Sequence, residues 1–417
     1  MNIQPHTSFI QALRPLYYVS KAIGMAPFSI INECLETDEE KFVSAFFNTS
    51  SIIWSVIVFL CLLANVIYSI TRVLLIRITM PGEFVLEFLN MPLVYITALI
   101  SVLAIICKRE TIFQLLRKAY NIDRRLFTKE DLGISYKKIR LNSIYILTVV
   151  SIFCTIFFTH EVIFWRNRIS CIYEATARIA DWVGIVMVFQ YCSAVIFIKL
   201  RMKALNRKFS ALLNKDSGSG VQIARTNKVL SSNRTELSTI HNITDSKIFP
   251  QVLEKPLESQ LLHECREIYN LIYVFCRTVN WIYGFPILLE LTSIFISYVN
   301  IIYATVNLVR RNFSIKTQAP SLLGWNIYSS FKELAITFLC ETAVNESRRL
   351  LDEVHEMLLK RDLSDEMRSE LQLFSLQLKH NKIQFSAAGL FVVGSSQFCS
   401  FVTGVTTYIV ILIQFSK

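Results

Sequence analysis

One face of the last predicted helix carries polar side chains inside an otherwise apolar segment. Thr403, Thr407, Val410 and Gln414 follow one another at steps of four, three and four residues, which places them on the same side of a helix. Hydroxyl and amide groups are costly in lipid unless they face protein or water. One explanation is helix–helix packing, in which threonine and Gly404 are common. The other is an ion pathway built by several copies around a symmetry axis.

Motifs that would support catalysis or metal binding are absent from the sequence. There is no P-loop, no GxGxxG and no GxSxG motif, and the ten cysteines form no CxxC pair. The dipeptides His263-Glu264 and His355-Glu356 lack a second histidine four residues after the first, so neither is a zinc-protease helix. We interpret both as pairs on a helix surface. We therefore expect no enzyme, no catalytic residue, no metal ligand and no cofactor.

A second set of candidates lies in the outer halves of the predicted membrane helices. Aromatic walls with a few polar groups are typical of small-molecule pockets, although tryptophan near the end of a span is also common as an interfacial anchor. Lys332 beside Glu333 fits either a pocket or a buried pair that joins helices. The candidate ligand-binding residues are Gln190, Tyr298, Tyr328, Trp325, Trp165, Trp182 and Tyr95.

The composition indicates a polytopic membrane protein that must position these residues. Of the 417 residues, 53 % are apolar and 18 % are charged, whereas soluble domains average about a quarter charged. Runs of about 20 apolar residues are long enough to cross a bilayer. Seven such windows predict an all-α fold with seven transmembrane helices, and six is the alternative because Lys332 and Glu333 lie in the sixth window. The windows are 52–71, 84–106, 143–165, 182–198, 283–308, 322–341 and 395–415.

The net charge of +11 fits either nucleic acid or the anionic surface of a lipid bilayer. We expect no nucleic-acid binding, because no basic domain stands apart from the apolar runs. Segment 107–142 holds ten Lys and Arg, whereas the short loops 72–83, 166–181 and 306–321 hold two or three each. Because basic residues favour the cytoplasmic side, this distribution predicts the N-terminus inside and the C-terminus outside.

The chain divides into four segments on this reading. Polar segments that continue from the spans show helical spacing, as Leu350 and Val354 do, and Ser364 is the predicted N-cap of a further helix. Residues 213–250 are polar and poor in aromatic residues, which predicts a disordered cytoplasmic insertion. The segments are a cytoplasmic N-terminal segment 1–46, membrane helices one to six with the ligand-binding bundle 47–342, cytoplasmic anchor helices 343–384 and a seventh helix 385–417.

The last helix also resembles a known family. Residues 407–415, TYIVILIQF, resemble the C-terminal signature of insect gustatory receptors, in which Thr-Tyr is followed by five apolar residues and then Gln-Phe. Residues 385–391, FSAAGLF, are similar to the family's pattern before its seventh helix, and residues 16–28 fit its weaker N-terminal motif.

This resemblance implies a ligand-gated cation channel in the plasma membrane of sensory neurons. It implies a homotetramer, or a heteromer with related subunits, that opens to permeant cations when a small-molecule tastant binds. Gln414 and Phe415 are then expected at the gate near the outer mouth, with Thr407, Val410 and Thr403 lining the path below. The inner extensions of helices four to seven are expected to form a cytoplasmic anchor domain.

The resemblance leaves the tastant open. The main sugar-receptor branch of the family tends to carry an acidic residue just after Thr-Tyr, where this chain has Ile409. We therefore favour a bitter, aversive or other non-sugar ligand, with a fructose-type sugar receptor as the alternative.

Two other classes of protein share a multi-helix membrane architecture. A G-protein-coupled receptor is disfavoured, because the sequence has no Asp-Arg-Tyr or Asn-Pro-x-x-Tyr motif and only two residues follow Phe415. A transporter is disfavoured because repeated halves are not evident.

Overall fold

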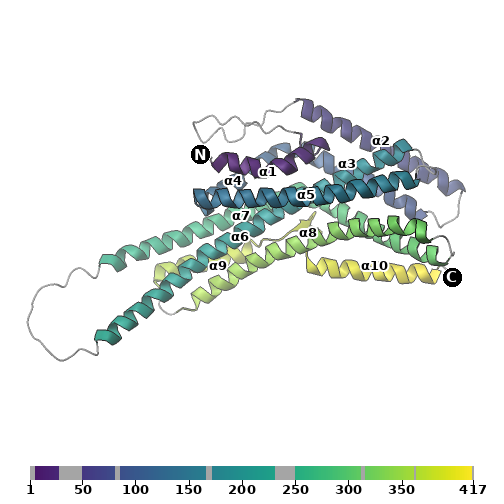
Figure 1. The fold of residues 1–417 in the computed structure, drawn as a ribbon. Coiled ribbons are helices and arrows are strands. Elements are labelled where there is room, and N and C mark those ends of the chain that lie inside the picture. Colours follow the sequence, from purple (N-terminus) through teal and green to yellow (C-terminus); the bar gives the residue numbers. More distant parts are fainter. Residues whose placement is uncertain are drawn as a thin grey trace, which may run out of the picture. The chain divides into compact units, whose positions relative to one another are not determined.

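The structure is a computed structural model that describes residues 5–27, 49–79, 85–165, 171–230, 249–310, 315–360 and 363–415. Within these ranges the chain forms ten α-helices and one short hairpin, which confirms the all-α prediction. The elements, labelled in Figure 1, are α1 Pro5–Ala22, α2 Thr49–Thr79, α3 Val85–Cys107, α4 Arg109–Leu126, α5 Lys129–Trp165, α6 Cys171–Leu230, α7 Phe249–Arg310, α8 Ile315–Leu358, α9 Asp365–His380, β1 Ser386–Ala387, β2 Phe391–Val392 and α10 Ser395–Phe415.

The chain forms two compact units, and the three longest helices each contribute to both. Unit 1 comprises Met1–Ile196, Phe275–Glu341 and Gln384–Lys417. Unit 2 comprises Phe197–Val274 and Thr342–Ile383. Unit 1 therefore holds α1 to α5, the hairpin and α10, together with the apolar parts of α6, α7 and α8. Unit 2 holds the remaining, more polar parts of those three helices and α9.

Among the described residues, four helices have the length and apolar composition to cross a membrane. They contain Thr49–Thr71, Gly133–Ile163, Arg178–Ala211 and Ser259–Tyr303. A fifth span is possible by composition if α3 and α4 count as one, although they are bent by 70° at Lys108. The stretches correspond to the first five predicted windows.

Helices α8 and α10, which cover the sixth and seventh windows, are not among these candidate membrane spans. The middle of the sixth window carries Lys332 and Glu333, which lower its hydropathy. Seven spans thus stay a prediction.

The outer helices of unit 1 expose large apolar side chains. Ile53 on α2 is 54 % exposed, and Ile156 and Ile163 on α5 are 68 % and 67 % exposed. By contrast, Val183, Val195 and many neighbours on α6 are completely buried. Apolar surface of this extent is unfavourable in water, and it suits helices whose outer faces contact lipid.

A short hairpin, residues 384–394, leads into α10, and we call it the lead-in hairpin. Ser386 pairs with Val392 and Ala387 with Phe391 in antiparallel register. The Leu390 N–H donates to the Ala387 carbonyl at 3.0 Å, while Ala388 and Gly389 have φ of +52° and +77°. These angles define the tight turn that fits antiparallel strands. An alanine in this conformation costs about 1–2 kcal/mol, so the surroundings must hold it.

Unit 2 is closed by apolar packing of α9 against the other helices. Leu350 and Val354 on α8 are buried, as their spacing predicts, and Phe374 of α9 is completely buried. Its ring lies edge-on to Phe209 and Tyr269, with centroids 6.2 Å and 6.0 Å away. The first turn of α9 is capped as predicted, because the Ser364 Oγ accepts from the Met367 N–H at 3.3 Å.

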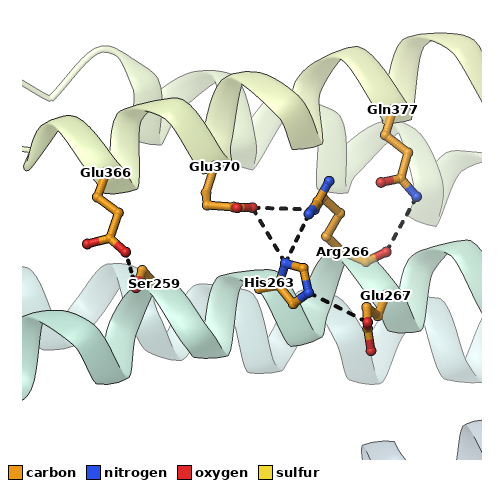
Figure 2. A network of polar contacts seen from close by, with 7 residues as sticks. All are labelled: Ser259, His263, Arg266, Glu267, Glu366, Glu370 and Gln377. Carbon is orange, nitrogen blue, oxygen red and sulfur yellow. Dashed lines mark hydrogen bonds and ion pairs between the residues drawn. The ribbon is translucent and has the colours of Figure 1, made fainter.

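Polar contacts between α7 and α9 surround His263 in unit 2 (Figure 2). Its ring is half exposed and lies 2.9 Å from the Arg266 guanidinium and 3.9 Å from Glu370. Arg266 also contacts Glu370, with 3.4 Å between Nε and Oε2. No group of three or more potential metal ligands occurs among the described residues, and His263 behaves as the helix-surface residue that the sequence predicts.

Part of the segment expected to be disordered is helical in this structure. Helix α6 continues to Leu230, and α7 begins at Phe249. Residues 231–248, which make up most of the second half of segment 213–250, lie outside the described residues.

Candidate functional site

The polar residues of α10 share one exposed face, as their spacing predicts. Thr403, Thr407, Val410 and Gln414 are all exposed, whereas Val405, about half a turn away, is 7 % exposed. An open groove of about 440 Å³ follows this face. The groove is lined by Val402, Thr403, Thr406, Thr407, Val410 and Ile411. Phe415 ends the helix, and its side chain lies outside the described residues.

The exposed polar face begins earlier than the sequence interpretation placed it. Ser396, Cys399 and Ser400 are exposed, and they lie three to seven residues before Thr403, on the same face. The same spacing rule, applied two turns further toward the start of the helix, would have identified them. We call Ser396, Cys399, Ser400, Thr403, Thr407, Val410 and Gln414 the polar stripe.

Three hydroxyls of the polar stripe donate hydrogen bonds within their own helix. Thr403 donates to the Cys399 carbonyl and Thr407 to the Thr403 carbonyl, both at 2.9 Å. Ser400 donates in the same way to Ser396 at 3.1 Å. Each hydrogen is thereby used, while the hydroxyl oxygen keeps acceptor capacity. These three side chains therefore present acceptor oxygens and need no partner helix to satisfy their donors.

Helix packing uses a different face of α10. The Phe295 ring on α7 lies edge-on to Phe401 and Tyr408 of α10, at 5.6 Å and 5.8 Å between centroids. A Cβ added to Gly404 would lie 3.1 Å from the Phe295 ring. Helix–helix packing and an ion pathway therefore concern different faces of α10. Gly404 packs against α7, whereas the threonines face outward.

Two carboxylates of α8 hold the first turn of α10. Glu341 accepts from the Ser395 N–H at 3.0 Å and from its hydroxyl at 3.1 Å, and a carboxylate at a helix N-terminus is favourable. Two residues further along α10, Gln397 donates to the Glu333 carboxylate at 3.2 Å. Figure 1 shows α10 lying alongside α8.

Three of the ligand-binding candidates meet around one phenylalanine. Phe158 on α5 lies 5.9 Å from Trp182 on α6 and 5.8 Å from Tyr328 on α8, in edge-on geometry. Trp325, one turn before Tyr328, completes the group at 5.7 Å from Tyr328. We call Phe158, Trp182, Trp325 and Tyr328 the aromatic cluster. Phe158 was not among the candidates, because one more phenylalanine in an apolar window carries no distinguishing signal.

Ionisable groups line the aromatic cluster. The Trp325 indole donates to Glu161 at 3.1 Å, and the Tyr328 hydroxyl donates to the Asp181 carbonyl at 2.8 Å. Arg178 pairs with Asp181 at 3.0 Å, and its guanidinium lies 5.1 Å from the Trp325 ring centroid. Arg178 and Asp181 were also missed, although a charged residue beside an apolar window is a recognised indicator of a functional site.

Lys332 forms a buried pair, but its partner is not the adjacent Glu333. Its ammonium lies 2.6 Å from Glu290 on α7 and 4.2 Å from the centroid of the Tyr328 ring. Adjacent residues on a helix point about 100° apart. Glu333 consequently faces α10, while Lys332 faces α7 and the aromatic cluster.

The remaining candidates lie in other surroundings. Gln190 on α6 donates to the Ser20 hydroxyl at 2.8 Å and to the Met25 carbonyl at 3.2 Å, so it fixes the end of α1. Tyr298 on α7 hydrogen-bonds to Ser330 and lies against α10. Tyr95 on α3 is 1 % exposed, and the side chain of Trp165 lies outside the described residues.

Apolar helices of spanning length, with charged and aromatic groups buried between them, define a multi-pass membrane protein. Comparison with known proteins makes this specific: residues 13–417 match the family described as 7tm Chemosensory receptor. The chain belongs to the 7tm chemosensory receptor family. Because this is a receptor family, the expectation that the chain is not an enzyme is confirmed.

Relatives and solved structures agree over nearly the full length. Two Drosophila melanogaster proteins, named "Putative gustatory receptor 28b" and "Putative gustatory receptor 28a", are each 22 % identical; the alignments cover 98 % and 97 % of this chain and 86 % and 91 % of those proteins. They confirm the resemblance to gustatory receptors. The insect olfactory receptor OR5 from Machilis hrabei has the same fold, with a TM-score of 0.69 at 12 % identity over 98 % of this chain and 99 % of that chain. A structure of OR5 in complex with eugenol matches with a TM-score of 0.63.

Proposed function

We propose that this chain is a subunit of a tastant-gated, non-selective cation channel in the plasma membrane of sensory neurons. Four subunits, identical or related, surround a pore that the polar stripe of α10 lines. The chain crosses the membrane seven times, with its N-terminus inside and its C-terminus outside. Unit 2 serves as the cytoplasmic anchor domain.

The observation that carries this proposal is the separation of the two faces of α10. One face packs on Phe295, whereas the other exposes hydroxyl and amide groups from Ser396 to Gln414. A ring of neutral oxygens replaces part of an ion's hydration shell without carrying a fixed charge. Because α10 contains no Asp or Glu, the pathway selects for cations weakly and does not act as a calcium filter. Gln414 and Phe415 form the gate.

We propose that the agonist binds at the aromatic cluster. Aromatic side chains with convergent polar groups are the usual lining of a ligand site, and Trp182, Trp325 and Tyr328 meet there beside Arg178. The olfactory receptor of the same fold takes a small aromatic molecule, eugenol. Ile409 after the Thr-Tyr pair favours a bitter, aversive or other non-sugar tastant, with a fructose-type ligand as the second candidate.

Cysteine accessibility on α10 tests the pore directly. Native Cys399 lies in the polar stripe, so it is first replaced by serine; Thr407→Cys and Val405→Cys are then compared in that background. We expect a cationic thiol reagent applied to whole cells to block the current of the exposed Thr407→Cys and to leave the buried Val405→Cys unchanged. Equal block of both variants would contradict a pore on this face.

The agonist and the gate are tested together by whole-cell recording from cells that express this chain alone. A panel of sugars and bitter compounds is applied, and a reversible cation current identifies the ligand class. We expect Gln414→Ala to change gating or conductance with surface expression intact. An unaltered current in that variant would move the gate elsewhere on α10.

A further inference from the structure

The lead-in hairpin is held by a side chain that hydrogen-bonds to its backbone. Asn280 on α7 donates from Nδ2 to the Gln384 carbonyl at 2.8 Å, and its Oδ1 accepts from the Ser386 N–H at 3.3 Å. One side-chain amide therefore satisfies two backbone groups, one in the residue before Phe385 and one in the residue after it. Cys276, one turn earlier on α7, donates to the same Gln384 carbonyl at 3.6 Å.

The hairpin also approaches α7 closely at a glycine, Gly284, where a Cβ would be in tight contact. A Cβ added to Gly284 would lie 3.1 Å from the Ala388 nitrogen and 3.3 Å from the Ser386 oxygen. Both contacts are to backbone atoms, which cannot rotate away as the end of a side chain can. Asn280 and Gly284 are four residues apart, so they present one face of α7 to the hairpin.

The far side of the hairpin is anchored in the core of unit 1. Phe385 is completely buried, and its ring lies edge-on to Tyr191 of α6 at 6.3 Å. The Tyr191 hydroxyl in turn contacts the Cys340 sulfur of α8 at 3.2 Å. The Val393 N–H donates to the Phe385 carbonyl at 2.8 Å and closes the hairpin two residues before α10 begins.

We propose that Asn280 and Gly284 are positioning residues that lock the lead-in hairpin to α7 and thereby set the position of α10. A displacement of α7 then reaches the polar stripe through the hairpin, in addition to the direct contact through Phe295. The positive φ of Ala388 fits this role, because a strained turn persists only where its surroundings over-determine it. This inference rests on the proposed function for its effect on current, but not for its effect on the position of α10.

Two variants with matched controls test the lock. In Gly284→Ala the added Cβ requires the hairpin backbone to move slightly away from α7, whereas Gly133→Ala on α5 has nothing within 4 Å of the added Cβ. Asn280→Asp removes the donor to Gln384, whereas Thr292→Val on α7 removes a hydroxyl that bonds to the Leu288 carbonyl of the same helix. All four are made in the full chain.

The first readout is amide hydrogen exchange of the purified receptor. We expect exchange of residues 384–394 and of the first turns of α10 to become faster in Gly284→Ala and Asn280→Asp, by about tenfold or more, and to stay unchanged in both controls. Faster exchange of the hairpin with no change in α10 would overturn the proposal. This readout needs neither an agonist nor a current.

The second readout is single-channel recording in lipid bilayers. We expect the open probability to change in the two variants while the unitary conductance stays at the wild-type value, because the polar stripe is untouched. Wild-type open probability in channels whose hairpin exchanges faster would show a merely structural role and overturn the proposal. If the wild-type chain alone conducts no ions, the proposed channel is not supported for a homomer, and the exchange of α10 still decides whether the hairpin positions it.

Discussion

Two lysine–glutamate pairs of similar length lie in the two units and differ in their surroundings. In unit 1, Lys332 and Glu290 are 2.6 Å apart, with side chains 10 % and 4 % exposed. In unit 2, Lys208 and Glu264 are 2.8 Å apart, with side chains 28 % and 40 % exposed. The chemistry and the distance are nearly the same, so the comparison isolates burial.

Burial changes what each pair does for its unit. An exposed ion pair contributes about 0–1 kcal/mol, because water and salt screen both charges. A buried pair contributes little net stability relative to apolar residues, yet removing one partner leaves the other charge without compensation. The pair in unit 1 therefore determines which faces of α7 and α8 meet beside the aromatic cluster. The pair in unit 2 lies on a surface that apolar contacts already hold together.

The largest expected effect breaks the buried pair alone. Lys332→Met leaves the Glu290 carboxylate buried without its cation, which we expect to cost about 3–5 kcal/mol. Lys208→Met, the matched change in unit 2, should cost about 0–1 kcal/mol. Thermal melting of the two purified variants in one detergent ranks them. Adding Glu290→Leu to Lys332→Met should recover most of the loss; equal melting of the two lysine variants would contradict the comparison.

An apolar substitution shows what holds unit 2. Leu371 on α9 is completely buried, and Leu371→Ala should cost about 2–5 kcal/mol through lost contacts and a residual cavity. Leu373, two residues away, is 45 % exposed, so Leu373→Ala should change the stability by no more than about 0.5 kcal/mol. The same melting assay checks both. A larger loss in Leu373→Ala would mean that α9 packs through its other face.

The features that the sequence predicted well depend on neighbouring residues. The spacing of Thr403 and Thr407 identified the exposed face of α10, and the Ser364 cap follows from side-chain chemistry within one turn. Apolar windows located the long helices because lipid-spanning length is a property of a continuous segment. Each of these signals lies within about 20 residues of chain.

The features that it missed depend on residues far apart in the chain. Lys332 and Glu333 were considered either as pocket residues or as a buried pair, and the sequence did not indicate that Lys332 pairs with Glu290 on another helix, 42 residues away. The contact of Gln190 with the end of α1 was not predicted either, because no local pattern reveals which helix faces an amide. The lead-in hairpin has only two residues in each strand, which is too short for a period-2 signal.

The helix cap of unit 2 is expected to have an intermediate effect. Ser364→Ala removes the oxygen that accepts from the Met367 N–H, which typically costs about 1 kcal/mol. Ser364→Asp restores an acceptor and adds a negative charge at the helix N-terminus, so it should melt at or above the wild-type temperature. An unchanged melting temperature in Ser364→Ala would show that the first turn of α9 is held by packing alone.

The smallest expected effect concerns the partly exposed ion pair of Figure 2. Arg266 and Glu370 are 3.4 Å apart with side chains 26 % and 24 % exposed, and His263 approaches both. A double-mutant cycle of Arg266→Ala and Glu370→Ala should give a coupling of about 0.2–1 kcal/mol that decreases as salt is added. The equivalent cycle of Lys332→Met and Glu290→Leu should give a larger coupling that salt does not change. If the Arg266–Glu370 coupling matched that value and resisted salt, exposure would not be what distinguishes the two units.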